Sequence, residues 1–205
     1  EIYMGDWSSD VCSSDLENTA QQRFGSVDTT MGSPVFGSSS APVTIVEYGD
    51  YQCPQCGNWF HNTRPQLETE YIETGKAKLV FVDLAFFGPD STNAAEATYC
   101  AGDQGKYWEY HNVLYSNQQG INDGWAGPDN LKSFATQMNL DRDLFDGCLD
   151  SDKYKQRVER NVLEAKRNGA NATPTFIIIG SNGAQETIEG AQPFSIFKQV
   201  LDSMA

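Results

Sequence analysis

The residues best suited to chemistry by type and spacing lie in one short segment, Cys53-Pro54-Gln55-Cys56. Two cysteines three residues apart can form a disulfide with each other and exchange it with other thiols. The same spacing occurs in zinc sites and in inert structural disulfides. Zinc needs about four ligands, whereas the sequence has no second pair of this kind and only His61 nearby. A redox-active dithiol is therefore the preferred interpretation, with a zinc half-site and an inert bridge as alternatives.

The residues around this pair predict a buried strand that runs directly into a helix. Residues 43–46 are all β-branched, which favours a strand, and Pro54 suits the first helical position because its missing N–H costs nothing there. Cys53 then lies at the helix N-terminus, where unpaired N–H groups and the helix dipole favour a thiolate. Cys56 lies one turn further along, so we expect Cys53 to face solvent and Cys56 to be the buried resolving cysteine.

A single carboxylate interrupts the apolar strand before the pair. Glu47 lies six residues before Cys53. A carboxyl group buried beside the cysteines would have a raised pKa and could take the proton from Cys56 as that sulfur attacks a mixed disulfide. The alternative is a carboxylate at the strand edge that bonds to Lys78 or to water.

The remaining patterns predict an α/β fold with an all-helical insertion. The helix from Pro54 should kink at Pro65 and end at Gly75, a common residue just past a helix. Asn93 with Glu96 three residues later resembles a capping signal that opens the next helix. Strands are expected at 43–46, 78–83, 175–179 and 187–188, and further helices within 93–104, 131–138, 141–148, 154–169 and 193–201.

The composition changes sharply near residue 40. Residues 1–40 are rich in Ser and Thr with few spaced hydrophobic residues, which predicts a disordered tail and linker. Residues 7–16 (WSSDVCSSDL) resemble translated sequencing-adapter sequence, which leaves open whether residues 1–16, with Cys12, are native. The rest is expected to divide into a strand-bearing part and a helical insertion, namely residues 41–90 with 170–205 and residues 91–169.

The charge and hydropathy of the chain exclude several classes of function. It has 14 Lys and Arg against 28 Asp and Glu, a formal net charge of −14. Such a charge repels phosphate backbones and anionic lipids, so we expect no nucleic-acid partner and no membrane-surface binding. No apolar run approaches the roughly 18 residues that a membrane span needs. The sequence begins at Glu1 without a leader, so an export signal or anchor would be missing from it.

Several further segments accompany the cysteine pair: APVTIVE (41–47), AEA (95–97), CA (100–101), QGKYW (104–108), TPTF (173–176) and GAQPF (190–194). With these segments, the chain from about residue 34 to 204 resembles the DsbA-like thiol:disulfide oxidoreductases of the thioredoxin superfamily. The resemblance implies a thioredoxin fold with an inserted helical domain, and a cis peptide bond before Pro174 that faces Cys53 and Cys56. It also implies that Thr173 and Pro174 bind substrate, by pairing with an extended chain as an added strand. The alternative is an ordinary trans proline before a strand.

Cys100 and Cys148 fall on apolar faces of expected helices in the insertion. Buried free cysteines are common, which is one interpretation of the two. Extracytoplasmic members of the family often carry a structural disulfide in this domain, and the resemblance therefore implies a Cys100–Cys148 bond.

The dipeptide between the active-site cysteines departs from the family. Pro54-Gln55 stands where strongly oxidising members carry Pro-His. Without that histidine, Cys53 has no local cation to stabilise its thiolate. We therefore expect a less oxidising protein than those members, and His111 is expected to be a packed or surface residue.

The sequence predicts a protein thiol:disulfide oxidoreductase that introduces disulfides into secreted or extracytoplasmic proteins, with no cofactor besides the Cys53–Cys56 disulfide and no metal. By resemblance, its partners are unfolded or reduced proteins and a membrane quinone-linked thiol oxidase. We expect a monomer in the periplasm or at the cell surface, anchored through a missing N-terminal segment if anchored at all. The alternatives are a disulfide reductase or isomerase on the same fold, and a non-enzymatic structural or zinc-binding module.

Overall fold

The computed structural model describes residues 23–24 and 27–204, so Cys12 and residues 1–16 lie outside the described part. Its centre is a four-stranded mixed sheet with the strand order β4-β3-β5-β6. β3 (Val43–Gly49) pairs in parallel with β4 (Ala77–Asp83) and antiparallel with β5 (Thr175–Ile179). β6 (Gln185–Glu189) pairs antiparallel with β5 and forms the expected hairpin. β3 and β5 are buried throughout, in keeping with their β-branched sequences.

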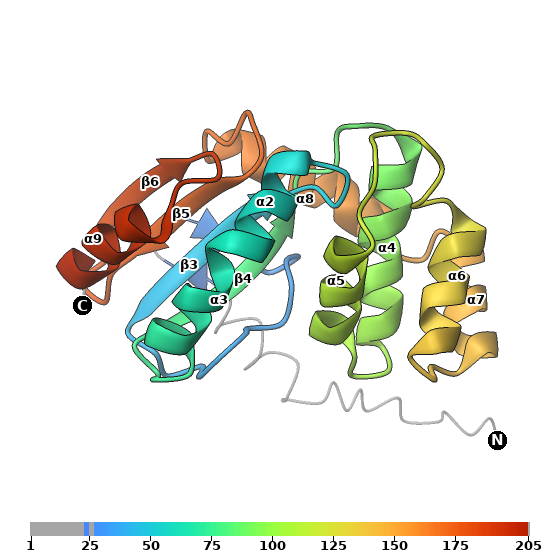
Figure 1. Cartoon of the computed structure of the whole chain (residues 1–205), viewed down its shortest axis with the longest axis horizontal. Helices are drawn as coiled ribbons and strands as arrows, with labels where there is room; N and C mark the ends of the chain where they lie inside the picture. Colours follow the sequence, from blue (N-terminus) through green and yellow to red (C-terminus); the bar gives the residue numbers. More distant parts are fainter. Residues whose placement is uncertain (1–22, 25–26, 205) are drawn as a thin grey trace, which may run out of the picture.

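Helices cover both faces of this sheet (Figure 1). On one face, Trp59, Phe176 and Phe197 pack together and join the active-site helix and the C-terminal helix to the sheet. On the other face, Ala165 packs with Val46 in a separate cluster. The first face carries α2 (Pro54–Asn62), α3 (Arg64–Leu67), the π-helical turn η1 (Glu68–Ile72) and α9 (Phe194–Met204), and the second carries α8 (Lys155–Arg167).

Four helices between β4 and α8 form a separate block beside the sheet (Figure 1). They are α4 (Pro89–Gly102), α5 (Tyr107–Ser116), α6 (Pro128–Gln137) and α7 (Arg142–Asp150). A disulfide between Cys100 and Cys148 joins α4 to α7, as the resemblance implied. The thioredoxin fold with an inserted helical domain is thereby confirmed.

The expected disordered linker up to residue 40 is wrong for residues 27–36. After β1 (Arg23–Phe24) and β2 (Val27–Asp28), which pair antiparallel, the chain runs along the edge of β4. The backbones of Phe36 and Leu79 exchange two hydrogen bonds, and the Ser33 N–H donates to the Phe81 carbonyl. This segment covers an edge that would otherwise present unpaired backbone groups. The sequence showed no sign of the pairing because backbone hydrogen bonds need no hydrophobic pattern.

Two helix boundaries show how proline acts in this chain. α2 ends at Asn62, before Pro65, and the helical path continues through α3 and the π-turn, as the kink predicted at this proline requires. The expected helix start at Asn93 is wrong, because α4 begins at Pro89, and Asn93 lies inside the helix. Proline at the first helical position decided this start. None of the helices within residues 27–204 is long and apolar enough to cross a membrane.

We predict that the Cys100–Cys148 bond contributes about 4 kcal/mol to the free energy of unfolding, because it closes a loop with a sequence separation of 48 residues. The measurement is urea unfolding in a Cys53→Ala, Cys56→Ala background, with and without dithiothreitol, so that reduction acts on this bond. The same background carrying Cys100→Ala and Cys148→Ala should no longer respond to dithiothreitol. An unchanged urea midpoint on reduction would contradict the prediction.

Candidate functional site

The cysteine pair lies where β3 leads into α2. Cys53 is the N-cap of α2, and Pro54 follows as its first residue, as the sequence predicted. The Cys53 sulfur accepts a hydrogen bond from the Cys56 backbone N–H at 3.5 Å. Pro54 and Gln55 are exposed, while 3% of Cys53 and 0% of Cys56 is accessible to solvent. The sequence predicted a solvent-facing Cys53, whereas the structure leaves only a small part of this residue exposed.

The environment drives the pKa values of the two thiols apart. A hydrogen bond from the Cys56 side chain, with backbone N–H groups of Cys56 and Gln55, lowers the pKa of Cys53 to about 6 against the opposing effect of burial. Burial, followed by the interaction with Cys53, raises the pKa of Cys56 well above its ordinary value. Near neutral pH, Cys53 is thus the thiolate and Cys56 remains a thiol, which is the division that dithiol exchange requires.

The loop before β5 completes the site from a distant part of the sequence. The Thr173–Pro174 peptide bond is cis, as the resemblance implied. The Thr173 carbonyl lies 3.3 Å from the Cys53 sulfur, and it accepts a hydrogen bond from Cys53 when that sulfur is protonated. The next carbonyl, that of Pro174, accepts the Gly190 N–H at 2.8 Å. The structure therefore brings Thr173 and Pro174 beside Cys53 across 120 residues of sequence.

Glu47 is buried in the centre of β3, paired with Phe81 on one side and Phe176 on the other. Neither of its carboxylate oxygens has a hydrogen-bond partner among the described residues. The pKa of Glu47 is raised to about 8, mainly by burial. The positive charge of Arg64 opposes this increase, and the negative charge of the Cys53 thiolate adds to it. The alternative contact with Lys78 does not form, because Lys78 pairs with Thr44 and its ammonium group donates to a carbonyl in the N-terminal segment.

Sequence reasoning missed Arg64, which is 2% exposed. Its guanidinium carbon lies 5.0 Å from the ring centre of Phe60, and its Nε bonds to Glu68 at 2.6 Å. It also contacts His111 Nδ1 at 3.3 Å. Since arginine can only donate, a neutral His111 accepts at Nδ1 and carries its proton on Nε2. An arginine in an amphipathic helix normally faces solvent, so the sequence held no signal for this buried cation.

His111 is fully buried among aromatic rings, which agrees with the expected packed histidine. Burial, with the adjacent charge of Arg64, lowers the pKa of His111 well below its ordinary value. His61, the additional zinc ligand considered from the sequence, instead bonds to the Tyr115 carbonyl at 3.2 Å. Within residues 27–204 no group of three or more His, Cys, Asp or Glu side chains is arranged to hold a metal ion.

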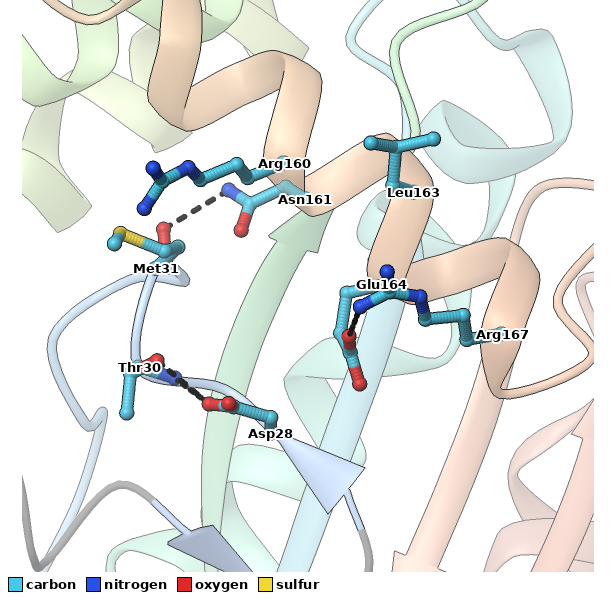
Figure 2. A pocket seen from close by; sticks show the side chains of 8 residues that line it. All are labelled: Asp28, Thr30, Met31, Arg160, Asn161, Leu163, Glu164 and Arg167. Carbon is cyan, nitrogen blue, oxygen red and sulfur yellow. Dashed lines mark hydrogen bonds and ion pairs between the residues drawn. The ribbon is translucent and has the colours of Figure 1, made fainter.

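A pocket of about 410 Å³ opens on the opposite face of the sheet, between residues 28–31 and α8 (Figure 2). Asn161 closes its inner side by donating to the Met31 carbonyl at 2.9 Å. Arg167 and Glu164 pair at its outer side at 3.4 Å. None of the site residues expected from the sequence lines this pocket.

We predict that Cys53 is alkylated by iodoacetamide with a pH midpoint near 6, because only the thiolate reacts. The rate should fall about tenfold for each pH unit below 6 and level off above 7, while Cys56 stays unlabelled. Mass spectrometry of reduced protein across pH measures both sites. Cys56→Ala removes the largest cause of the lowered pKa, so its midpoint should rise. A midpoint near about 8.5 in the unaltered protein, as for an ordinary thiol, would contradict the prediction.

The chain is similar to known proteins in sequence and in fold. Disulfide bond formation protein D of Bacillus subtilis is 30% identical over 150 residues, which cover 72% of this chain and 68% of that protein. The crystal structure of oxidised BdbD from Bacillus subtilis matches with a TM-score of 0.78 at 26% identity, over 88% of this chain and 96% of that one.

A Wolbachia pipientis α-DsbA1 structure, 23% identical, matches with a TM-score of 0.74 over 83% of this chain and 89% of that chain, and supports the fold alone. Residues 29–202 match the pattern of a thioredoxin family. The chain belongs to this thioredoxin family and is a DsbA-like thiol:disulfide oxidoreductase.

Proposed function

We propose that the protein introduces disulfides into extracytoplasmic proteins, with Cys53 as the exchanging cysteine and Cys56 as the resolving one. The observation that carries the proposal is the opposite displacement of the two pKa values at the start of α2: the pKa of Cys53 falls to about 6, whereas that of Cys56 rises. A stable Cys53 thiolate favours the reduced form of the pair, and a pair with a stabilised reduced form is an oxidant of other thiols.

The reaction proceeds through one mixed disulfide. A substrate thiolate attacks the Cys53 sulfur of the Cys53–Cys56 disulfide, a new sulfur–sulfur bond forms, and Cys56 leaves with the electron pair. A second substrate thiolate then attacks the substrate sulfur, and Cys53 leaves as a thiolate. The substrate loses two electrons and gains a disulfide, and the cysteine pair gains both electrons.

Glu47 supplies the proton that the leaving Cys56 takes up. Its pKa of about 8 keeps it protonated at neutral pH, and the high pKa of Cys56 makes that sulfur a strong base once it leaves. In the reverse step, where Cys56 attacks the mixed disulfide, the ionised Glu47 accepts the proton. A carboxyl with a pKa near the working pH suits both directions.

The substrate chain lies against the loop before β5. Thr173 and Pro174 would present their backbone to an extended segment, beside the sulfur that Thr173 already contacts. The name of the Bacillus subtilis relative, disulfide bond formation protein D, supports a substrate that gains a disulfide. The Cys100–Cys148 disulfide supports an oxidising, extracytoplasmic compartment. A membrane quinone-linked thiol oxidase would restore the Cys53–Cys56 disulfide in a monomeric protein.

We predict a reduction potential for the Cys53–Cys56 pair well above the roughly −270 mV of thioredoxin and below the roughly −120 mV of the most oxidising relatives. The first limit follows from the lowered pKa of Cys53, and the second from Gln55 in place of histidine. Equilibration with glutathione buffers and counting of alkylated thiols by mass would measure it, with Cys100 and Cys148 tracked separately. A value near about −270 mV would instead favour a reductase, and a pair that never cycles would favour the structural module.

Replacing Glu47 with Gln should slow substrate oxidation at neutral pH by roughly 10²-fold, the lower range of general acid–base catalysis, and remove the pH dependence around 8. The measurement is stopped-flow oxidation of a reduced dithiol peptide between pH 6 and 9. Glu73→Gln, at an exposed glutamate, is the matched control. Equal rates for Glu47→Gln and Glu73→Gln across this range would remove the proton-transfer role.

A further inference from the structure

A loop of the helical insertion is hydrogen-bonded to the loop that carries Cys53. Gln118, just after α5, donates from its side-chain amide to the Tyr51 carbonyl at 2.6 Å and to the Cys53 carbonyl at 2.9 Å. Four residues later, the Asn122 N–H donates to the side chain of the buried Gln52 at 2.7 Å. The backbone before the active-site helix is therefore held from outside the thioredoxin part of the fold.

Gly57 provides the space in which Gln118 lies. A Cβ atom at position 57 would meet Gln118 Oε1 at 2.0 Å, closer than real contacts allow, so the Gln118 side chain would have to move away. Gly57 has no positive φ that would demand glycine, and glycine within a helix is less favourable than alanine. The absence of a side chain at this position therefore serves the approach of Gln118 to the first turn of α2.

We propose that Gln118 is a positioning residue for thiol exchange, which acts on Cys53 through the backbone and depends on Gly57 for access. The inference rests on the proposed role of Cys53. Gln118 touches the carbonyl of Cys53 and not its sulfur. It fixes the N-cap conformation in which that sulfur accepts the Cys56 N–H at 3.5 Å.

Loss of the Gln118 amide should weaken this contact and shift the Cys53 thiolate toward the thiol. In Gln118→Ala, the alkylation midpoint of Cys53 should rise by about half a pH unit, which makes alkylation at pH 5 about threefold slower. Gln118→Met keeps a side chain of similar length without N–H donors, and should shift the midpoint as far. Comparison of the two variants separates the effect of the lost hydrogen bonds from the effect of lost side-chain packing.

A double-mutant cycle tests the dependence on Gly57. Gly57→Ala alone should shift the midpoint in the same direction, because the added methyl displaces Gln118. In the Gln118→Ala background, Gly57→Ala should add nothing further, since no side chain remains to be displaced. Asn117→Ala is the control, because the side chain of Asn117, which caps the end of α5, donates to the Val113 carbonyl at 2.8 Å and not to the active-site loop. The midpoint of this variant should not move.

Midpoints in Gln118→Ala and Gln118→Met that match Asn117→Ala would overturn the proposal. Additive shifts in the Gly57 cycle would overturn the dependence on Gly57. If Gln118→Ala does not fold, Gln118→Met and Gly57→Ala decide the question. Because alkylation needs no substrate, failure of the unaltered protein to oxidise a dithiol peptide would refute the proposed function alone, and the cycle would still report on positioning.

Discussion

The site depends on one constraint: Cys53 must occupy the N-cap of α2 with its sulfur turned toward the first backbone N–H groups of the helix. The first turn of any helix leaves N–H groups unpaired, and here the Cys56 N–H reaches the Cys53 sulfur. The same turn buries Cys56, whose pKa rises as that of Cys53 falls. β3 ends just before Cys53, and Gln118 of the helical insertion is hydrogen-bonded to the loop between β3 and α2.

Two buried ionisable residues, Glu47 and Arg64, lie near the cysteine pair and also determine its chemistry. Glu47 points to the face of the sheet that α2 covers, because side chains alternate along β3 and Ile45 lies on that face. A lone carboxyl in this position is costly to ionise, and the buried guanidinium of Arg64 offsets part of that cost. The balance leaves the pKa of Glu47 at about 8, where a carboxyl can both donate and accept a proton.

Much of the fold and the core of the site follow from local sequence. Strands at β3 and β5 are β-branched runs, and Pro54 and Pro65 mark where a helix starts and where it bends. The errors have two sources: the predicted start of α4 rests on a capping signal that lies inside the helix, and the N-terminal segment is defined by backbone pairing rather than by side-chain pattern. The edge pairing of Phe36 with Leu79 joins residues 43 positions apart, and residues 27–36 have no hydrophobic periodicity that predicts it.

The sequence by itself determined the chemistry, because a Cys-Pro-Gln-Cys segment between a strand and a helix predicts a dithiol at a helix N-terminus. The apolar strand before it singled out Glu47, and the family resemblance supplied Thr173 and Pro174. The tertiary structure alone decided that Arg64 is buried, that Gln118 reaches the Cys53 backbone and that Gly57 leaves room for it. The physical reason is that these effects are contacts between distant segments. An arginine, a glutamine and a glycine acquire these roles only through their neighbours in space.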